Sequence, residues 1–177
     1  MSEVVAKVYV DGSNIFYTQK KLGWSVDWVK MKEYAMSGRT ILEWRYYVGL
    51  KDDDEKMQGY VRYLNAIGFT TAPKPLKKIK ITQGETHAPH ALQSGFVYKA
   101  NVDVEITTDI FLDRSQTNEI ILMSGDSDFA YLVKRLKDAG KRVTVFSSKK
   151  TISWELKLSA SRVWYFEDLK SKIARDQ

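Results

Sequence analysis

An uncharged, strongly apolar run leads directly into an acidic turn in the segment Glu119-Ile-Ile-Leu-Met-Ser-Gly-Asp-Ser-Asp128. The apolar part, residues 120–123, is short and uninterrupted, as is typical of a strand buried on both faces of a parallel sheet. Asp126 and Asp128 follow where a helix over residues 128–139 is expected to begin. The segment therefore predicts an α/β fold with two carboxylates at the carboxyl end of a central strand.

A second predicted strand, residues 4–10, ends in the same way. It is rich in valine and runs into Asp11, which is followed by Gly12-Ser13-Asn14. The carboxyl ends of parallel strands open into one crevice, where ligands bind in open α/β sheets. Carboxylates that converge there repel one another unless a cation neutralises them. The two strand ends together predict a divalent-metal site.

The rest of the chain alternates strands and helices. Further strands are expected at 40–50, 69–72, 142–146 and 162–166, and helices at 14–22, 27–36, 52–67, 102–112, 152–158 and 167–175. The interval 73–98 is irregular and basic, with two short strands expected around 78–82 and 92–99. This alternation predicts one three-layer, Rossmann-like α/β domain over residues 1–177, with a mostly parallel central sheet flanked by helices and a basic insertion at about 73–98.

Composition narrows the classes of function. The 28 Lys and Arg residues outnumber the 22 Asp and Glu residues, and a net charge of +6 favours an anionic partner. The chain has no cysteine, which excludes disulfides and thiolate metal sites. No basic-then-apolar leader and no apolar run of membrane-spanning length occurs, so we expect a cytoplasmic protein that does not contact a membrane.

Three segments resemble, in order and approximate spacing, the motifs of NYN domains, which belong to the LabA-like branch of the PIN-like nuclease superfamily. They are Val8-Tyr-Val-Asp-Gly-Ser-Asn14, Lys99-Ala-Asn-Val-Asp-Val104 and Leu122-Met-Ser-Gly-Asp-Ser-Asp-Phe129. The tail is also similar to the last strand and helix of the family, at Gly140-Lys-Arg-Val-Thr-Val-Phe146 and Ser153-Trp-Glu-Leu156. The resemblance covers most of the chain and implies a PIN-like sheet.

The same resemblance implies a function. It is that of a metal-dependent ribonuclease, which hydrolyses phosphodiester bonds of single-stranded or structured RNA with Mg²⁺ or Mn²⁺. Related PIN-like proteins often form homodimers. Carried over by motif, the catalytic and metal-binding residues are Asp11, Asp103, Asp126 and Asp128, with Asn14, Ser124 and Asp109 in support.

Physical chemistry favours the same kind of site. Hydrolysis of a phosphodiester needs an activated water and a neutralised anionic transition state, and a divalent metal supplies both. Mg²⁺ prefers oxygen ligands and retains several waters, so a few carboxylates suffice. Asn14 is placed to orient Asp11 or a metal-bound water. Amides after Ser124, near the start of a helix, suit a phosphate oxygen.

Some of these residues have simpler alternatives. Asp128 could serve only as a helix cap and Asp126 only as a turn residue. Asp103 and Asp109 are six positions apart and lie on different sides of a helix, so we expect Asp103 to be the ligand. Asp109 could equally cap a neighbour or hold a lysine. Asn101 replaces the family's usual glycine, and we expect it to keep the turn because asparagine tolerates the left-handed conformation.

A second group of residues is predicted to contact RNA. A lysine in this setting could follow the phosphate backbone, and an exposed aromatic ring beside it could stack on a base. The alternatives are an edge strand kept soluble by lysines, and a surface turn beside a core tryptophan. The candidates are Lys78, Lys80 and Lys99 in the insertion, and Lys149 and Lys150 near Trp154.

The two histidines and the other four tryptophans suggest no site. His87 and His90 stand in a loop-like segment outside the three motifs, so we expect both to be exposed to solvent. The remaining tryptophans follow apolar periodicities and are expected in the core: Trp24, Trp28, Trp44 and Trp164.

Rival classes of acidic site fit less well. A haloacid-dehalogenase-type phosphatase needs an aspartate where this chain has Ser13, and a von Willebrand A-type site needs a serine where it has Ile15. A dinucleotide-binding domain needs a glycine-rich turn, but Gly12 stands alone. One alternative from another class stays open, a catalytically weak RNA-binding or regulatory adaptor that retains the PIN-like fold.

Overall fold

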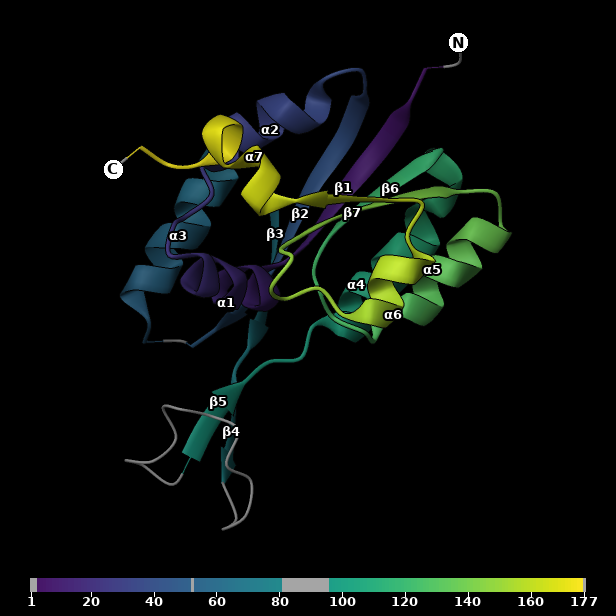
Figure 1. The fold of residues 1–177 in the computed structure, drawn as a ribbon. Helices are drawn as coiled ribbons and strands as arrows, with labels where there is room; N and C mark the ends of the chain where they lie inside the picture. Colours follow the sequence, from purple (N-terminus) through teal and green to yellow (C-terminus); the bar gives the residue numbers. More distant parts are fainter. Residues whose placement is uncertain (1–2, 52, 81–95, 177) are drawn as a thin grey trace.

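A parallel sheet forms the centre of the protein in the computed structural model, which describes residues 3–51, 53–80 and 96–176 (Figure 1). Its six strands lie in the order β3-β2-β1-β6-β7-β8, and every neighbouring pair is parallel. They are β1 (Val5–Asp11), β2 (Thr40–Leu50), β3 (Thr70–Pro75), β6 (Glu119–Met123), β7 (Arg142–Ser147) and β8 (Arg162–Tyr165). The predicted α/β fold with a mostly parallel sheet is confirmed.

The strand order reverses between β1 and β6. From β1 the chain builds outward through β2 to β3, and it later builds outward on the other side from β6 through β7 to β8. Such a switch point leaves a crevice at the carboxyl ends of the two central strands, because their connections leave in opposite directions. Those carboxyl ends lie at the lower edge of the sheet in Figure 1.

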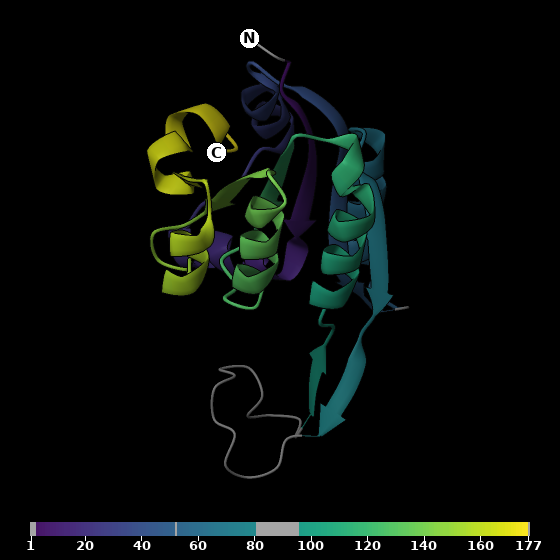
Figure 2. The ribbon, with the colours of Figure 1, turned by 90° about the vertical axis from the view of Figure 1, so that its right-hand side faces the viewer.

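Helices cover both faces of the sheet. One layer contains α1 (Gly12–Leu22), α2 (Trp28–Met36), α3 (Glu55–Ala66) and α7 (Phe166–Ile173). The other contains α4 (Asp103–Asp113), α5 (Phe129–Asp138) and α6 (Trp154–Ser159), which lie side by side in Figure 2, with the short helix η2 (Arg114–Gln116) after α4. Within the described residues, every helix is too short or too polar to span a lipid bilayer.

The central strands are apolar throughout because both of their faces are covered. Ile121 and Met123 of β6 pack in the cluster under α1, α2 and α7, whereas Ile120 and Leu122 pack in the cluster under α4 and α5. Since side chains alternate along a strand, a strand covered on both sides needs an unbroken apolar run. The sequence 120–123 has this pattern.

The tryptophans divide between core and surface. Trp28 and Trp44 are buried, and Trp24 and Trp164 are partly buried against the same cluster, so the prediction for these four is confirmed. Trp154, by contrast, is 65% exposed at the start of α6. The alternative that made it a core residue is therefore wrong.

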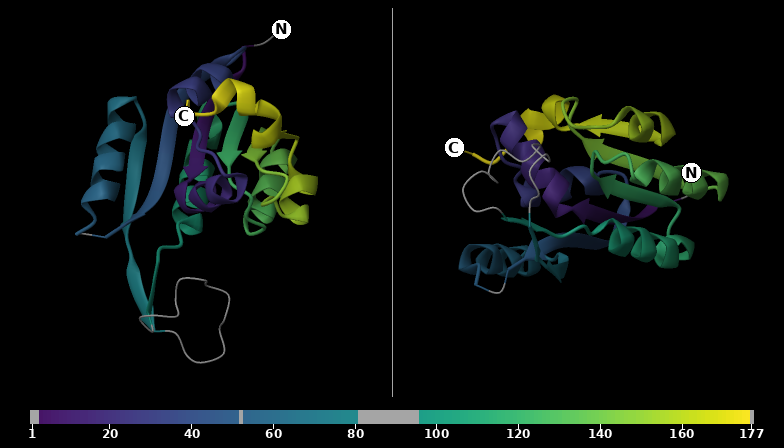
Figure 3. Two further views of the ribbon diagram at one scale, coloured as in Figure 1. Left: turned by 60° about the vertical axis from the view of Figure 1, so that its left-hand side comes forward. Right: turned by 90° about the horizontal axis from the view of Figure 1, so that it is seen from below.

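A small antiparallel arm leaves the lower edge of the sheet. It consists of β4 (Lys77–Lys80) paired with β5 (Phe96–Lys99), and it projects away from the body in Figures 1, 2 and 3. The predicted insertion thus contains two short strands, at 77–80 and 96–99. His87 and His90 lie outside the described residues, as does the loop predicted between the strands.

One buried charge stabilises the opposite, amino end of the central strands. Glu119 is fully buried at the start of β6, where its carboxylate accepts hydrogen bonds from Arg39 Nε at 2.8 Å and Thr144 Oγ1 at 2.6 Å. Burial by itself would raise the pKa of Glu119, but the bonds from Arg39 and Thr144 outweigh it and hold this pKa below its ordinary value.

This network predicts a pH-dependent stability. The folded pKa of Glu119 lies below the unfolded value of about 4.3, so its charge stabilises the fold above that pH and the gain is lost as the pH falls through the folded pKa. We expect Glu119→Gln to lower the free energy of unfolding by on the order of 3 kcal/mol at neutral pH, and by clearly less below about pH 4. Urea unfolding at both pH values measures this difference.

The exposed Glu33 on α2 provides the matched control. Glu33→Gln should change the free energy of unfolding little at either pH. A Glu119→Gln deficit that stays constant as the pH falls would contradict the stabilising role of the Glu119 charge.

Candidate metal centre

Asp11 joins the two central strands at the switch point. It is the last residue of β1 and only 4% exposed. One carboxylate oxygen caps α1 by accepting the Asn14 amide at 3.0 Å, and the other accepts the Ser124 hydroxyl at 3.0 Å. Ser124 directly follows β6, so a single side chain ties the end of β1 to the end of β6.

The electrostatic setting of Asp11 is that of a crowded acidic pocket. Burial raises the pKa of Asp11, and the hydrogen bonds from Asn14 and Ser124 oppose this shift. The negative charges of Asp103 and Asp126 raise the pKa further, and the net direction is upward. Residues from three separate parts of the chain thus contribute negative charge to one place.

Hydrogen bonds from backbone amides to side-chain oxygens hold the loop between β6 and α5 in place. The Asp126 amide donates to Ser124 Oγ at 3.2 Å, and the Asp128 amide donates to Asp126 Oδ1 at 3.0 Å. The Gly125 amide donates to Asn14 Oδ1 at 2.9 Å, which fixes this loop against α1. The carboxylate of Asp128 makes no capping hydrogen bond to α5. Asp128 thus stands at the N-cap position of α5, as the simpler explanation expected, but its carboxylate does not cap the helix.

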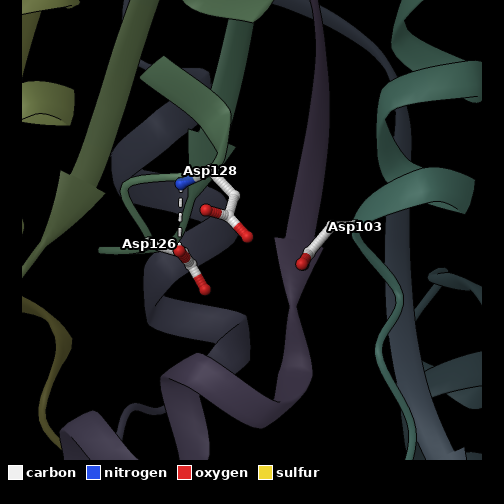
Figure 4. A group of neighbouring side chains, drawn as sticks. All are labelled: Asp103, Asp126 and Asp128. Carbon is white, nitrogen blue, oxygen red and sulfur yellow. Dashed lines mark hydrogen bonds between the residues drawn. The ribbon is translucent and has the colours of Figure 1, made fainter. Parts of the chain in front are cut away.

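Three carboxylates face one another at the mouth of the crevice. Asp103, Asp126 and Asp128 each offer one oxygen, and these oxygens all lie within 4.8 Å of one another. Figure 4 shows Asp126 and Asp128 extending from their loop toward Asp103 at the start of α4. The cavity between them has a volume of about 240 Å³ and is also lined by Asp11, Asn14 and Tyr17.

The carboxylate oxygens of this cluster suit one chemical class of ion. Hard divalent cations such as Mg²⁺ and Mn²⁺ prefer oxygen ligands, and the spacing allows several oxygens to reach one ion. A cation would also offset the mutual repulsion of the carboxylates. The residues present therefore fit a divalent cation of the class that the sequence predicted.

Lys74 of β3 holds the start of α4 in place. Its ammonium group donates to the Asn101 carbonyl at 2.6 Å and pairs with Glu105 at 2.6 Å. The Asn101 side chain in turn accepts the Asp103 amide at 2.9 Å. No described residue other than glycine has a positive φ, so the expected left-handed Asn101 is wrong. Asparagine preserves this turn through its side-chain oxygen instead.

Asp109 is turned away from the carboxylate cluster toward β2. Its carboxylate accepts the Tyr47 hydroxyl at 2.7 Å and pairs with Arg45 at 2.9 Å. Asp113 of the same helix pairs with Lys7 at 3.1 Å and accepts the Tyr9 hydroxyl at 3.0 Å. Asp109 thus holds an arginine and a tyrosine rather than the lysine considered above, and it fixes α4 against the sheet.

Sequence reasoning missed this network, although a signal was present. Charged or hydroxylated side chains alternate on one face of each strand, at Lys7 and Tyr9 of β1 and at Glu43, Arg45 and Tyr47 of β2. A period of two in strands that are otherwise apolar predicts polar side chains pointing at the same neighbouring element. Here that element is α4.

The lysines predicted to contact RNA divide into two groups. Lys149 and Lys150 lie in the turn between β7 and α6. The Lys149 ammonium pairs with Asp168, and the Lys150 ammonium donates to the Lys21 carbonyl at 3.4 Å. Lys78 is part of β4 in the arm. The side chains of Lys80 and Lys99 lie outside the described residues. RNA contact by these lysines stays a prediction.

The geometry separates the role of Asp109 from that of a metal ligand. We expect Asp109→Asn to lower the free energy of unfolding by on the order of 1 kcal/mol, because the pair with the partly exposed Arg45 loses its charge. The affinity of the Asp109→Asn variant for Mn²⁺, measured by calorimetry, should stay within about twofold of wild type, because the oxygens that would bind the ion remain. Asp126→Asn, measured alongside, should lose at least about tenfold. A tenfold loss in Asp109→Asn at unchanged stability would place Asp109 in the metal site.

Comparison with known proteins identifies the family and the fold. The NYN domain profile matches residues 6–167. Over 172 residues, which are 96% of this chain and 88% of the relative, the chain is 31% identical to the low amplitude and bright protein LabA of Synechococcus elongatus. A crystal structure of a protein of unknown function from Vibrio parahaemolyticus shares the fold, with a TM-score of 0.76 at 22% identity over 98% of this chain and 97% of that one. The chain belongs to the NYN domain family.

Proposed function

We propose that this protein is a metal-dependent ribonuclease that hydrolyses RNA phosphodiester bonds in the acidic crevice between β1 and β6. One observation carries the proposal, namely that oxygens of Asp103, Asp126 and Asp128 lie within 4.8 Å of one another at the switch point of the sheet. A nuclease-type family and an oxygen donor set for Mg²⁺ or Mn²⁺ support the same conclusion.

The protein would position the metal ion and would not supply a nucleophilic side chain. Asp103, Asp126 and Asp128 would hold the ion, which when bound lowers the pKa of a coordinated water and neutralises phosphate charge. Asp11 is proposed as the fourth carboxylate, because it lines the same cavity and each of its oxygens, although bonded once, has a second lone pair. Ser124 and Asn14 keep the two loops at a fixed separation.

RNA is the substrate that the surroundings favour. The pocket is also lined by Ala100 and Asn101, which directly follow β5, so the base of the lysine-bearing arm adjoins the carboxylates. A net charge of +6 in a protein with an acidic crevice means that the positive charge lies elsewhere on its surface. A polyanion could thus be attracted to the surface around a pocket that would repel it without metal.

Replacement of one carboxylate oxygen tests the proposal. We expect Asp126→Asn to reduce Mn²⁺-stimulated cleavage of a labelled RNA pool by about two orders of magnitude or more, because a charged ligand is lost. Its melting temperature without metal should be unchanged or raised. Asparagine keeps the oxygen that accepts the Asp128 amide, and the substitution relieves repulsion between like charges.

Asp138→Asn is the matched control, since Asp138 ends α5 on the surface and pairs only with Arg135 at 3.4 Å among the described residues. It should cleave as wild type does, and chelator should abolish cleavage by both. Undiminished cleavage by Asp126→Asn would remove the proposed site. Tight RNA binding by the wild type with no chelator-sensitive products would favour the RNA-binding adaptor instead.

A further inference from the structure

A second and larger cavity lies on another face of α1 from the acidic pocket. Its volume is about 540 Å³, within the range of roughly 300–1,000 Å³ that is usual for ligand pockets. It lies between α1 and α3 over the end of β2. Its aromatic walls come from four parts of the chain, at Phe16, Trp28, Tyr46, Tyr60 and Tyr63.

The walls combine a fixed inner part with an accessible rim. Tyr60 is held by a hydrogen bond from Trp28 Nε1 to its hydroxyl at 2.6 Å, and Tyr63 stacks on Tyr60 with ring centroids 6.1 Å apart. Phe16 is 47% exposed and Tyr63 is 43% exposed. Aromatic faces that are accessible and already held in position are suited to stacking on a flat, conjugated ligand.

The aromatic surface continues to the acidic pocket. Tyr17 lines the acidic pocket, whereas the preceding Phe16 lines the aromatic cavity. Their rings meet edge to face with centroids 5.6 Å apart, and Tyr17 is 62% exposed. Gly12, in the wall of the aromatic cavity, directly follows Asp11. A chain bound at the carboxylates therefore has a short aromatic path into the cavity.

The charges at the rim favour a ligand that carries phosphate. Arg175 lines the cavity, is exposed, and forms no ion pair among the described residues. The Lys20 ammonium lies 4.5 Å from the centroid of the Phe16 ring. The acidic residue of the lining, Asp27, already accepts the amides of Val29 and Lys30 as the cap of α2. A base flanked by phosphodiesters matches both the rings and the cations.

We propose that the aromatic cavity receives one nucleobase of the RNA strand whose backbone lies at the acidic pocket, an assignment that rests on the proposed ribonuclease function. The base would stack against Phe16 and Tyr63. The cavity would thereby fix the register of the strand, because the distance along the RNA between the stacked base and the phosphate at the carboxylates is constant.

Fluorescent RNA tests this assignment. Oligonucleotides with a single 2-aminopurine, moved one position at a time, are titrated with wild-type protein in Ca²⁺ in place of Mn²⁺. We expect emission to be quenched at one position. Phe16→Ala and Tyr63→Ala should each abolish the quenching and weaken binding roughly 5- to 150-fold, the range expected for one base–aromatic stack.

Phe111→Ala is the matched control, because Phe111 is 54% exposed on α4, across the sheet from the cavity. It should bind within about twofold of wild type, and the melting temperatures of all three variants show whether each is folded. A free 2-aminopurine ribonucleotide should bind far more weakly than the oligonucleotide. Equal affinity would identify a mononucleotide site and overturn the assignment to an RNA strand.

The outcomes distinguish this inference from the function on which it rests. If the wild type cleaves RNA but Phe16→Ala and Tyr63→Ala, both folded, bind it as the wild type does, the base site is wrong and the ribonuclease stands. If quenching is lost in these variants but the wild type gives no Mn²⁺-dependent products, the ribonuclease is wrong and the base site stands. Failure of the wild type to bind RNA overturns both.

Discussion

A single buried carboxylate holds the switch point of this sheet together. Asp11 accepts one hydrogen bond from the first turn of α1 and one from Ser124 at the end of β6. Asn14 adds a second link by accepting the Gly125 amide. Segments more than a hundred residues apart in the chain are thereby joined at one edge of the sheet, as the separation of 113 positions between Asp11 and Ser124 shows. The acidic cluster depends on this junction, because Asp126 and Asp128 are displayed on the loop that it fixes.

Close backbone packing reinforces the junction. A Cβ atom on Gly12 would lie 2.4 Å from the Tyr47 carbonyl, and one on Gly125 would lie 2.5 Å from the Thr151 carbonyl. Both contacts are with backbone atoms, which cannot rotate away as a side chain can. Glycine is required at these two positions because the backbone of β2 at Tyr47 and the backbone of the turn after β7 at Thr151 approach too closely for any side chain. The glycines of the first and third acidic motifs therefore serve packing.

The third member of the cluster reaches the site through a different set of forces. Asp103 starts α4, and this helix is attached to the sheet by ion pairs from Arg45 and Lys7 to Asp109 and Asp113, while Lys74 anchors its first turn. The helix contributes one carboxylate to the site and uses three others, those of Glu105, Asp109 and Asp113, to hold its own position. Because a charge left without its partner in a partly buried place is costly, the network favours one placement of α4 and hence of Asp103.

Periodicity and strand-end chemistry were enough to derive the α/β class, the parallel sheet and the acidic loop after β6, because burial on two faces and the start of a helix are properties of neighbouring residues. Only the tertiary structure settled four other features. They are the strand order, the placement of Asp103 beside the other carboxylates, the pairing of Asp109 with Arg45 and the exposure of Trp154. The same holds for the aromatic cavity, whose walls come from α1, α2, α3 and β2. Each of these features depends on which distant segments pack together, and that choice is made by the fit of whole surfaces rather than by any local pattern.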